Sequence, residues 1–377
     1  MKKNFLVLFA VILSMGACQN FEIEHPNYKY TAGYFPYQFP VRTLILGDYI
    51  YDNENDNAHR FVISAEFGGV YENKTNRKFV FQVDNSLCNN ILFSSGGEPI
   101  QAMPSNYYTL SSPSEIVIPK GKMSGGVTVQ LTDAFFDDPG AIKRTYVVPL
   151  RLVSSNDVDT ILSGLATMAN PDPRIVGNWT LAPKNFTMFA VKYINEYDGT
   201  YLYYGKSTVK NAAGTMLGES TYKDKYVEYN SIMRFNTTAR RQVTTPGTIA
   251  FRSVMPGNFP LVLSFDNNDN CTVSGTGTYT RTGSVPDPND PEKEIDVTYT
   301  TSYQVSGNGK FVSKQKDSYT SFGNKDRDVI NLNYTVVVTS TNDPNVDSGW
   351  VYSAEDSFVF RNRNVVMEVY TPALAVQ

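Results

Sequence analysis

The sequence predicts an all-β protein, and three observations lead to this fold class. Residues 297–305 and 330–338 alternate apolar and polar side chains with a period of two and are rich in β-branched and aromatic residues, as strands with one buried face require. Turn-forming clusters such as "DNENDN" (52–57) and "SGNGK" (306–310) separate such runs. The chain contains no amphipathic helical stretch of twelve or more residues, and its short links predict antiparallel strands.

The N-terminal segment has the pattern of a secretory signal. Lys2 and Lys3 precede an apolar stretch, residues 5–13, that is too short to span a bilayer as a permanent helix. Residues 15–17, Met-Gly-Ala, stand before Cys18 and resemble a bacterial lipobox. This resemblance implies that residues 1–17 are removed and that Cys18 is acylated and holds the protein on outer-membrane lipid; the alternative is an ordinary signal peptide followed by an unrelated cysteine.

The length of the chain after residue 17 predicts two domains, because one ordinary core does not extend over so many residues. We place the boundary around "ANPDPR" (169–174), where prolines remove backbone donors and restrict the residues before them. The expected organisation is a signal peptide over 1–17, a tether over 18–34, a β-sandwich over 35–156, a linker over 157–174 and a second β domain over 175–377.

Composition and motifs exclude several functional classes. The net charge of −4 argues against a nucleic-acid partner, which needs a basic face. The two histidines, His25 and His59, cannot form a His-rich metal site, and no GxSxG, HExxH or phosphate-binding loop occurs. The acidic residues lie mostly in turn clusters, so we expect no enzymatic activity. Cys88 and Cys271 are expected to be buried thiols, with a disulfide as the alternative.

No cofactor is predicted, although calcium needs a separate test. "DNENDN" begins with oxygen ligands at alternate positions, but it lacks glycine at position 6 and has Ile63 in place of glutamate at position 12. The EF-hand pattern therefore fails. A looser calcium site in a loop stays open as an alternative.

The first half contains four motifs, "VDNSL" (83–87), "YYTL" (107–110), "EIVIPKGK" (115–122) and "RTYVVPLRL" (144–152). In this order they resemble the N-terminal immunoglobulin-like domain of a family of Bacteroidetes surface lipoproteins. Many proteins of this family are encoded in glycan-utilisation loci beside Sus-type outer-membrane transporters. The resemblance implies an immunoglobulin-like β-sandwich, a lipid-anchored protein of the outer membrane, and a Sus-type transporter complex as a partner. Glu22 and Glu24 resemble the signal that exports such lipoproteins to the cell exterior.

The second half resembles the partner domain of the same proteins through "FAVKYINEYDGTYLYYGK" (189–206) and "FVFRNRNVVMEVYTP" (358–372). Gly177, Asn178 and Trp179 are similar to the first strand of a lipocalin. This likeness implies an eight-stranded, lipocalin-like meander barrel with Trp179 as its plug and Arg361 or Arg363 packed across the ring. The rival architecture is a second β-sandwich.

Aromatic residues are the remaining chemical signal, with 25 Tyr, 22 Phe and 2 Trp in the chain. Sugars stack their C–H faces on aromatic rings, while polar side chains bind their hydroxyl groups. We therefore expect a non-catalytic surface protein that binds a glycan for a Sus-like uptake system. The predicted glycan-binding residues are Trp350, which follows a polar loop, and Tyr197, Asp198, Tyr201 and Tyr203 around "EYDG".

Two other functions stay open at this point. One is an adhesion or scaffold lipoprotein without a small ligand, and the other is a lipocalin-type carrier of an apolar ligand. In addition, Asp159, Thr160 and Ile161 match the short pattern of Bacteroidetes periplasmic O-glycosylation, so Thr160 is a candidate for that modification.

Replacing Cys18 with Ser should leave the protein unacylated and release it from the membrane fraction, because no other apolar window of about 18 residues exists to hold it there. Fractionation of cells that express the wild type and the variant measures this. If intact cells shield the wild type from added protease, display on the cell surface is wrong and a periplasmic location replaces it.

Overall fold

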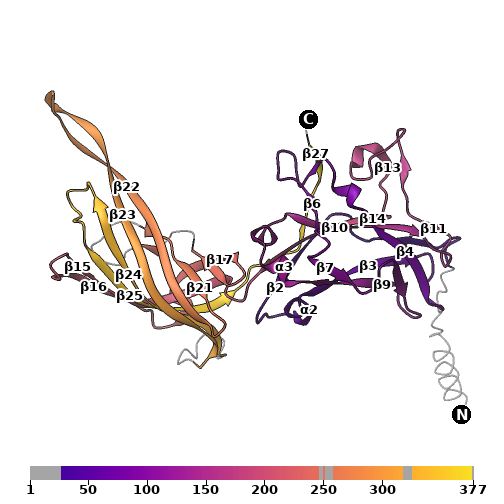
Figure 1. The fold of residues 1–377 in the computed structure, drawn as a ribbon, viewed down its shortest axis with the longest axis horizontal. Helices are drawn as coiled ribbons and strands as arrows, with labels where there is room; N and C mark the ends of the chain where they lie inside the picture. The colour runs from indigo at the N-terminus through magenta and orange to yellow at the C-terminus, as the bar shows by residue number, and fades with distance from the viewer. Residues whose placement is uncertain (1–26, 246–248, 251–257, 317–324, 376–377) are drawn as a thin grey trace, which may run out of the picture.

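The computed structural model confirms the all-β prediction and has two bodies joined side by side (Figure 1). It describes residues 27–245, 249–250, 258–316 and 325–375. Cys18 and the lipobox-like residues before it lie outside the described residues. One body is a β-sandwich and the other a closed barrel, as the preferred architecture predicts. The rival second sandwich is therefore excluded.

The sandwich consists of two sheets. The first has the strand order β11 (Thr160–Ile161), β1 (Ala32–Tyr34), β3 (Arg60–Gly68), β9 (Ser124–Leu131) and β7 (Tyr108–Leu110). The second has the order β26 (Glu368–Val369), β2 (Pro40–Ile45), β14 (Phe186–Ile194), β10 (Tyr146–Ser154), β4 (Arg77–Val83) and β8 (Glu115–Ile118), with β6 (Gln101–Ala102) paired to β10. The α-helices α2 (Glu54–Asn57) and α3 (Asp133–Phe136) and the 3₁₀ turns η1 (Asn85–Cys88) and η2 (Pro139–Ile142) are short connections.

Strand alternation forms the sandwich core. In β3, Phe61, Ile63, Ala65 and Phe67 are buried while the residues between them are not. Because side chains of a strand point alternately to opposite faces, one face of β3 enters the core. β14 differs, since its burial continues on both faces. One face packs in the sandwich core, and the other joins a second cluster with η1 and the C-terminal Tyr370.

The second domain does not begin at residue 175, as predicted, because β14 belongs to the sandwich. β14 pairs antiparallel with β10 and parallel with β2, so it is a strand of the sandwich, and the barrel begins at β15 (Gly199–Lys210). After the barrel, β26 pairs with β2 and β27 (Ala373–Leu374) pairs with β5 (Ile91–Leu92). The barrel is therefore inserted between two strands of the sandwich.

The barrel is an eight-stranded antiparallel meander. Its order is β15, β17 (Ser231–Ala239), β18 (Gln242–Thr244), β21 (Val262–Phe265), β22 (Asn270–Asp287), β23 (Asp290–Gln315), β24 (Arg327–Thr341) and β25 (Val351–Asn362), and β25 pairs with β15 to close it. β16 (Met216–Tyr222) pairs with the far half of β15 and is followed by the 3₁₀ turn η4 (Val227–Tyr229). β19 (Ile249–Ala250) and β20 (Asn258–Phe259) form a separate small hairpin.

Large side chains fill the barrel interior. The core there includes the rings of Tyr201, Phe235, Tyr303, Tyr352 and Phe358, each buried. A lipocalin-type carrier needs an internal cavity for its apolar ligand. This packing argues against that function.

The lipocalin-like plug is wrong. Trp179 lies in β13 (Trp179–Leu181), which follows the 3₁₀ turn η3 (Val176–Asn178) and pairs with β12 (Leu165–Ala166) outside the barrel. Its Nε1 donates to the carbonyl oxygen of Asp172 at 2.8 Å. Arg363 instead stacks over Phe360, with 5.2 Å from the guanidinium carbon to the ring centroid. The three-residue likeness therefore marks a linker hairpin.

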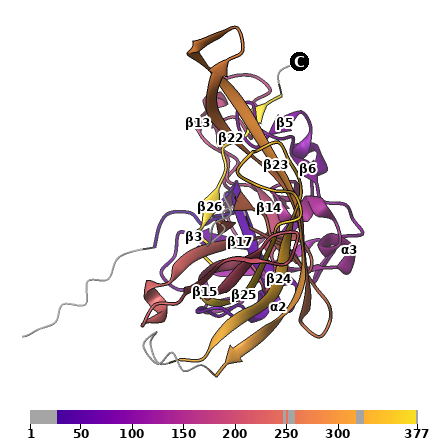
Figure 2. The ribbon, with the colours of Figure 1, turned by 90° about the vertical axis from the view of Figure 1, so that its left-hand side faces the viewer.

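Strands β22 and β23 continue beyond the barrel as a two-stranded arm (Figure 2). Their pairing runs from Asn270 opposite Lys310 to Asp287 opposite Asp290, whereas β24 pairs with β23 only as far as Thr301. Residues 284–296, which are rich in proline and acidic residues, form the end of this arm. Arg281 stabilises the base of the arm. It forms an ion pair with the buried Asp343, and its guanidinium carbon lies 4.4 Å from the ring centroid of Tyr299.

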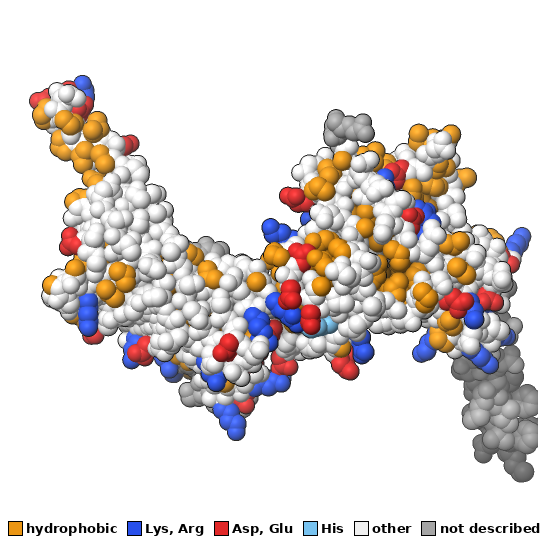
Figure 3. Space-filling model, in the orientation of Figure 1, with side chains coloured by type: hydrophobic (Ala, Val, Ile, Leu, Met, Phe, Trp, Pro, Cys, Tyr) orange, Lys and Arg blue, Asp and Glu red, His pale blue; other side chains and the backbone are white. Residues whose placement is uncertain are grey.

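The two bodies differ at the surface. The barrel face seen in Figure 3 is mainly white, the colour of uncharged polar side chains and backbone, and apolar side chains are more frequent over the sandwich. No helix among the described residues has the length and apolar character needed to span a bilayer.

Cys88 and Cys271 are both buried and unpaired, as expected, and burial raises the pKa of each thiol to about 12. We predict that neither reacts with a chromogenic disulfide reagent at pH 8 while the protein is folded, because the thiolate is the reactive form. Both should react after addition of denaturant. Rapid reaction of the native protein would contradict the buried positions.

Candidate functional site

The structure buries four of the five residues predicted to bind a glycan. Tyr197 and Tyr201 are fully buried, and Tyr203 and Asp198 expose 4% and 2% of their surface. Tyr201 and Tyr203 share one face of β15, as their spacing predicts, but that face points into the barrel. These four residues therefore do not form a surface on which a sugar could stack.

Tyr197 and Tyr201 have identifiable structural roles. The Tyr197 ring stacks on Phe265 with centroids 3.6 Å apart, and its hydroxyl donates to Asp269 Oδ1 at 2.8 Å. Burial, together with the nearby Glu196 and Asp269, raises the pKa of Tyr197 above its usual range. The Tyr201 hydroxyl donates to the carbonyl oxygen of Tyr197 at 2.8 Å. Both side chains thus fix the loop that leads into the barrel.

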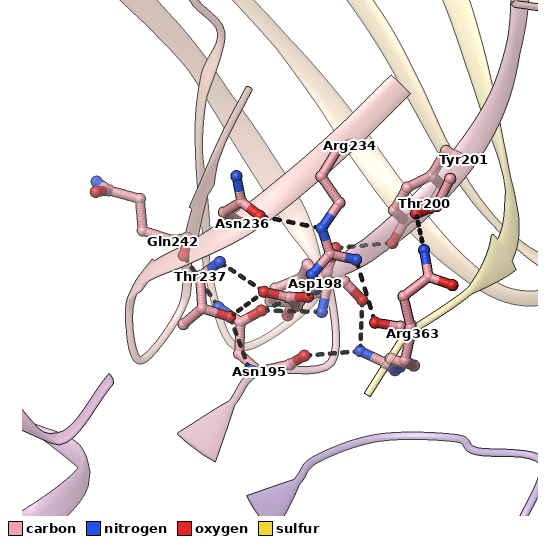
Figure 4. A network of polar contacts seen from close by, with 11 residues as sticks. Asn195, Asp198, Thr200, Tyr201, Arg234, Asn236, Thr237, Gln242 and Arg363 are labelled. Atoms are coloured by element: carbon pink, nitrogen blue, oxygen red, sulfur yellow. Dashed lines mark hydrogen bonds and ion pairs between the residues drawn. The ribbon is translucent and has the colours of Figure 1, made fainter. Parts of the chain in front are cut away.

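Asp198 is the centre of a polar network between the barrel and the sandwich (Figure 4). Its carboxylate accepts hydrogen bonds from Arg234 and from the Thr237 backbone nitrogen and hydroxyl, the last two at 2.7 and 2.9 Å. The Arg363 Nη1 donates to the carbonyl oxygens of Asn195 and Asp198 at 2.8 and 2.7 Å. Its Nη2 donates to the carbonyl of Asp48 in the sandwich at 3.2 Å. This network is structural.

Trp350 is half-buried and packs against the barrel core. Its carbonyl accepts a hydrogen bond from the Val338 nitrogen at 2.9 Å, and its indole Nε1 is buried without a hydrogen-bond partner among the described residues. The ring is therefore only partly exposed, and the loop before it brings Val346 into the core.

The barrel instead carries a polar groove across the outer face of five strands, which we call the waist groove. Antiparallel register aligns its outward side chains in three cross-strand rows. The rows are Tyr204, Ser357 and Asn331; Thr221, Lys206, Glu355 and Asn333; and Glu219, Thr208, Ser353, Thr335 and Ser306. Because closed sheets are strongly twisted and narrow at the middle, the outer face is concave along the strands there.

The groove consists of two adjoining open hollows of about 850 and 380 Å³. Both are lined by Lys206, Thr221, Asn333 and Glu355, so the hollows are continuous. Lys206 and Glu355 form an exposed ion pair at 3.0 Å, and the Ser357 hydroxyl donates to Asn331 Oδ1 at 2.8 Å. The surface therefore offers hydroxyl, amide, ammonium and carboxylate groups within one hollow.

Tyr204 is the aromatic ring of the groove. It is partly exposed, and Lys223 Nζ lies 4.8 Å from its ring centroid. It alternates with Tyr203, so it takes the outer face when Tyr203 takes the inner one. The alternation was readable in the sequence. The inward direction of Tyr201 and Tyr203, which decides which tyrosine is accessible, was not.

The loop considered for calcium hydrogen-bonds its carboxylate oxygens within the protein, and so does the similar turn "DNNDN" at 266–270. "DNENDN" contains α2, where the buried Asp56 pairs with Arg42 and accepts a hydrogen bond from the Ile45 nitrogen at 3.0 Å. Asp266 accepts the backbone nitrogens of Asn268 and Asn270 at 2.8 and 2.9 Å, as in an ordinary turn. Within the part of the chain that the structure describes, no group of three or more His, Cys, Asp or Glu is placed to hold a metal ion.

Comparison with known proteins gives the family of the chain. The crystal structure of a protein of unknown function from Bacteroides ovatus matches 93% of this chain and 100% of its own, with 34% identity and a TM-score of 0.76. This chain belongs to the family of that protein. A family model described as an N-terminal domain matches residues 27–159, and a domain of unknown function, DUF5627, matches residues 196–285 and 289–364. The second match agrees with a barrel that begins after β14.

More distant structures also come from Bacteroides. An auxiliary nutrient-binding protein from Bacteroides thetaiotaomicron shares 13% identity over 85% of this chain and 90% of its own, with a TM-score of 0.31. A multidomain protein including DUF1735 from Bacteroides ovatus shares 11% identity over 89% and 97%, with a TM-score of 0.32. At such scores neither likeness carries an argument about function. No curated protein matches the chain.

The Asp198→Ala variant should lose about 3 kcal/mol or more of unfolding free energy, because it leaves the buried hydrogen-bond donors around Asp198 unpaired. Urea denaturation followed by circular dichroism measures the loss. The exposed Asp347 gives a matched control, and its substitution with Ala should change stability by less than about 0.5 kcal/mol. Equal stability of the two variants would contradict the structural role of Asp198.

Proposed function

We propose that this protein is a non-catalytic glycan-binding protein that binds a glycan chain in the waist groove. The observation that carries the proposal is the groove itself, where three rows of polar side chains and one aromatic ring line a continuous open hollow. A sugar needs hydrogen-bond partners for its hydroxyl groups and a ring for its apolar face. The groove supplies both.

The chemistry of the groove favours a glycan over other ligands. An apolar ligand would leave the hydroxyl and amide groups of the groove without water or a partner, which is unfavourable. A nucleic acid needs an excess of positive charge, whereas Lys206 is paired with Glu355 and the third row begins with the acidic Glu219. A largely neutral polyol matches this balance of groups.

The cellular setting is part of the same proposal. The resemblance to Bacteroidetes surface lipoproteins supports a protein held by acylated Cys18 at the outer membrane, facing the exterior, beside a Sus-type transporter. In this setting the protein captures a polysaccharide or glycoprotein glycan and raises its concentration near the transporter.

One observation favours a second candidate, the adhesion or scaffold lipoprotein. The arm of β22 and β23 extends beyond every other strand of the barrel among the described residues. A two-stranded ribbon is of marginal stability by itself, so contact with another macromolecule would stabilise it. This function applies if no glycan binds.

A glycan array with the mature protein tests the proposal, followed by calorimetric titration of any glycan that binds. Tyr204→Ala should weaken affinity about thirtyfold, as loss of an aromatic hot spot of about 2 kcal/mol does. Glu355→Gln should weaken it about tenfold, because a charged hydrogen bond is lost. The thermal midpoint of each variant shows whether it is folded.

A matched ion pair on the arm provides the control. Lys293 and Asp290 are exposed and lie 2.8 Å apart, like Lys206 and Glu355, but far from the groove. Asp290→Asn should leave glycan affinity unchanged. If wild-type affinity survives in Tyr204→Ala and Glu355→Gln, the groove is not the site; if no glycan binds the wild type, the proposal fails.

A further inference from the structure

Three segments form the end of the sandwich that lies farthest from the barrel (Figure 1): residues 27–31, 69–76 and 119–123. Hydrogen bonds hold the first two together, since the Tyr28 nitrogen donates to the Gly69 carbonyl at 2.9 Å and the Tyr71 nitrogen donates to Asn27 Oδ1 at 3.1 Å. The buried Asn73 joins the third segment through Nδ2, which donates to the carbonyls of Pro119 and Lys122, each at 2.9 Å. These segments therefore form one fixed surface, which we call the distal patch.

Tyrosine rings stand out from the distal patch. Tyr28, Tyr30 and Tyr71 expose 73%, 51% and 68% of their surface, and Tyr28 and Tyr30 pack edge to face with centroids 5.7 Å apart. Met123, in the third segment, exposes 38%. Large rings are rarely left in water without a function when several occur together, because each costs free energy there.

The charge of the distal patch is positive although the chain has a net charge of −4. Its three segments contain four exposed lysines, Lys29, Lys74, Lys120 and Lys122, and one acidic residue, Glu72. Within the described residues none of these lysines forms an ion pair; the one salt bridge nearby joins Lys78 to Glu115, outside the patch. The patch thus combines a local excess of positive charge with exposed rings.

We propose that the distal patch lies against an anionic membrane surface. Lysines near such a surface are attracted to acidic headgroups, and tyrosine rings favour the boundary between headgroups and acyl chains. Asn27, the first described residue, belongs to the patch. The nine residues from Cys18 to Pro26 reach at most about 30 Å when extended, so a lipid on Cys18 would bring the patch to the membrane. The proposal does not depend on what the waist groove binds.

Binding to vesicles tests this directly. The probe is the chain of residues 18–377 with Cys18→Ser, which keeps every described residue and has no acyl anchor. It should sediment with vesicles of three parts phosphatidylcholine to one part phosphatidylglycerol and much less with phosphatidylcholine alone. Each Lys→Gln change at positions 29, 74, 120 and 122 should lower the partition coefficient about fivefold, since each lysine contributes about 1 kcal/mol. Raised salt should weaken binding similarly.

A matched set of lysines separates the patch from the overall charge. Lys210, Lys225, Lys293 and Lys310 are exposed on the barrel and its arm, and their joint change to Gln alters the net charge equally. This control should retain the preference for anionic vesicles, while the joint change of the four patch lysines removes it. Tyr71→Ser should weaken binding with the thermal midpoint unchanged. The proposal is overturned if the wild type does not bind anionic vesicles, or if the Lys→Gln changes in the two sets weaken binding equally.

Discussion

The guanidinium of Arg363, just after barrel strand β25, joins the barrel to the sandwich, and these two bodies have no sheet in common. Only 1% of the surface of Arg363 is exposed. The guanidinium donates hydrogen bonds to main-chain carbonyls in the loops before β15 and after β2. A buried cation is tolerated only where several acceptors replace water. Here the acceptors come from the loop that enters the barrel and from the sandwich, so the first and last barrel strands and the sandwich are fixed at one point.

The same junction explains why so many aromatic and acidic residues of "NEYDGTYLYY" are structural. Asn195 and Asp198 order the loop, and Tyr197 and Tyr201 fill the space beneath it. The outward-facing residues that line the waist groove are mainly polar and lie outside the barrel core.

Local pattern predicted the strands and the alternation of their side chains, because a period of two is visible in single segments such as Ile330–Val338. It did not predict the groove, which requires the register of β15 against β16 and β25, a property of distant segments. The proline-rich stretch at 169–174 suggested a boundary that the apolar faces of β14 contradict, since a strand buried on both sides belongs inside a sandwich. The likeness of residues 177–179 to the first strand of a lipocalin was misleading, because three residues can specify a turn but not a barrel.

Insertion of the barrel between β14 and β26 gives the protein two covalent connections where tandem domains have one. Rotation about a single flexible link is thereby removed, and any force on the barrel is shared by two chains that end in the same sheet. A cut after β25 leaves the barrel covalently attached to β14, whereas after a cut before β15 noncovalent contacts hold it, such as the pairing of β26 with β2 and of β27 with β5. Release of the barrel after a single cut before β15 would therefore also require the pairing of these two C-terminal strands to be lost.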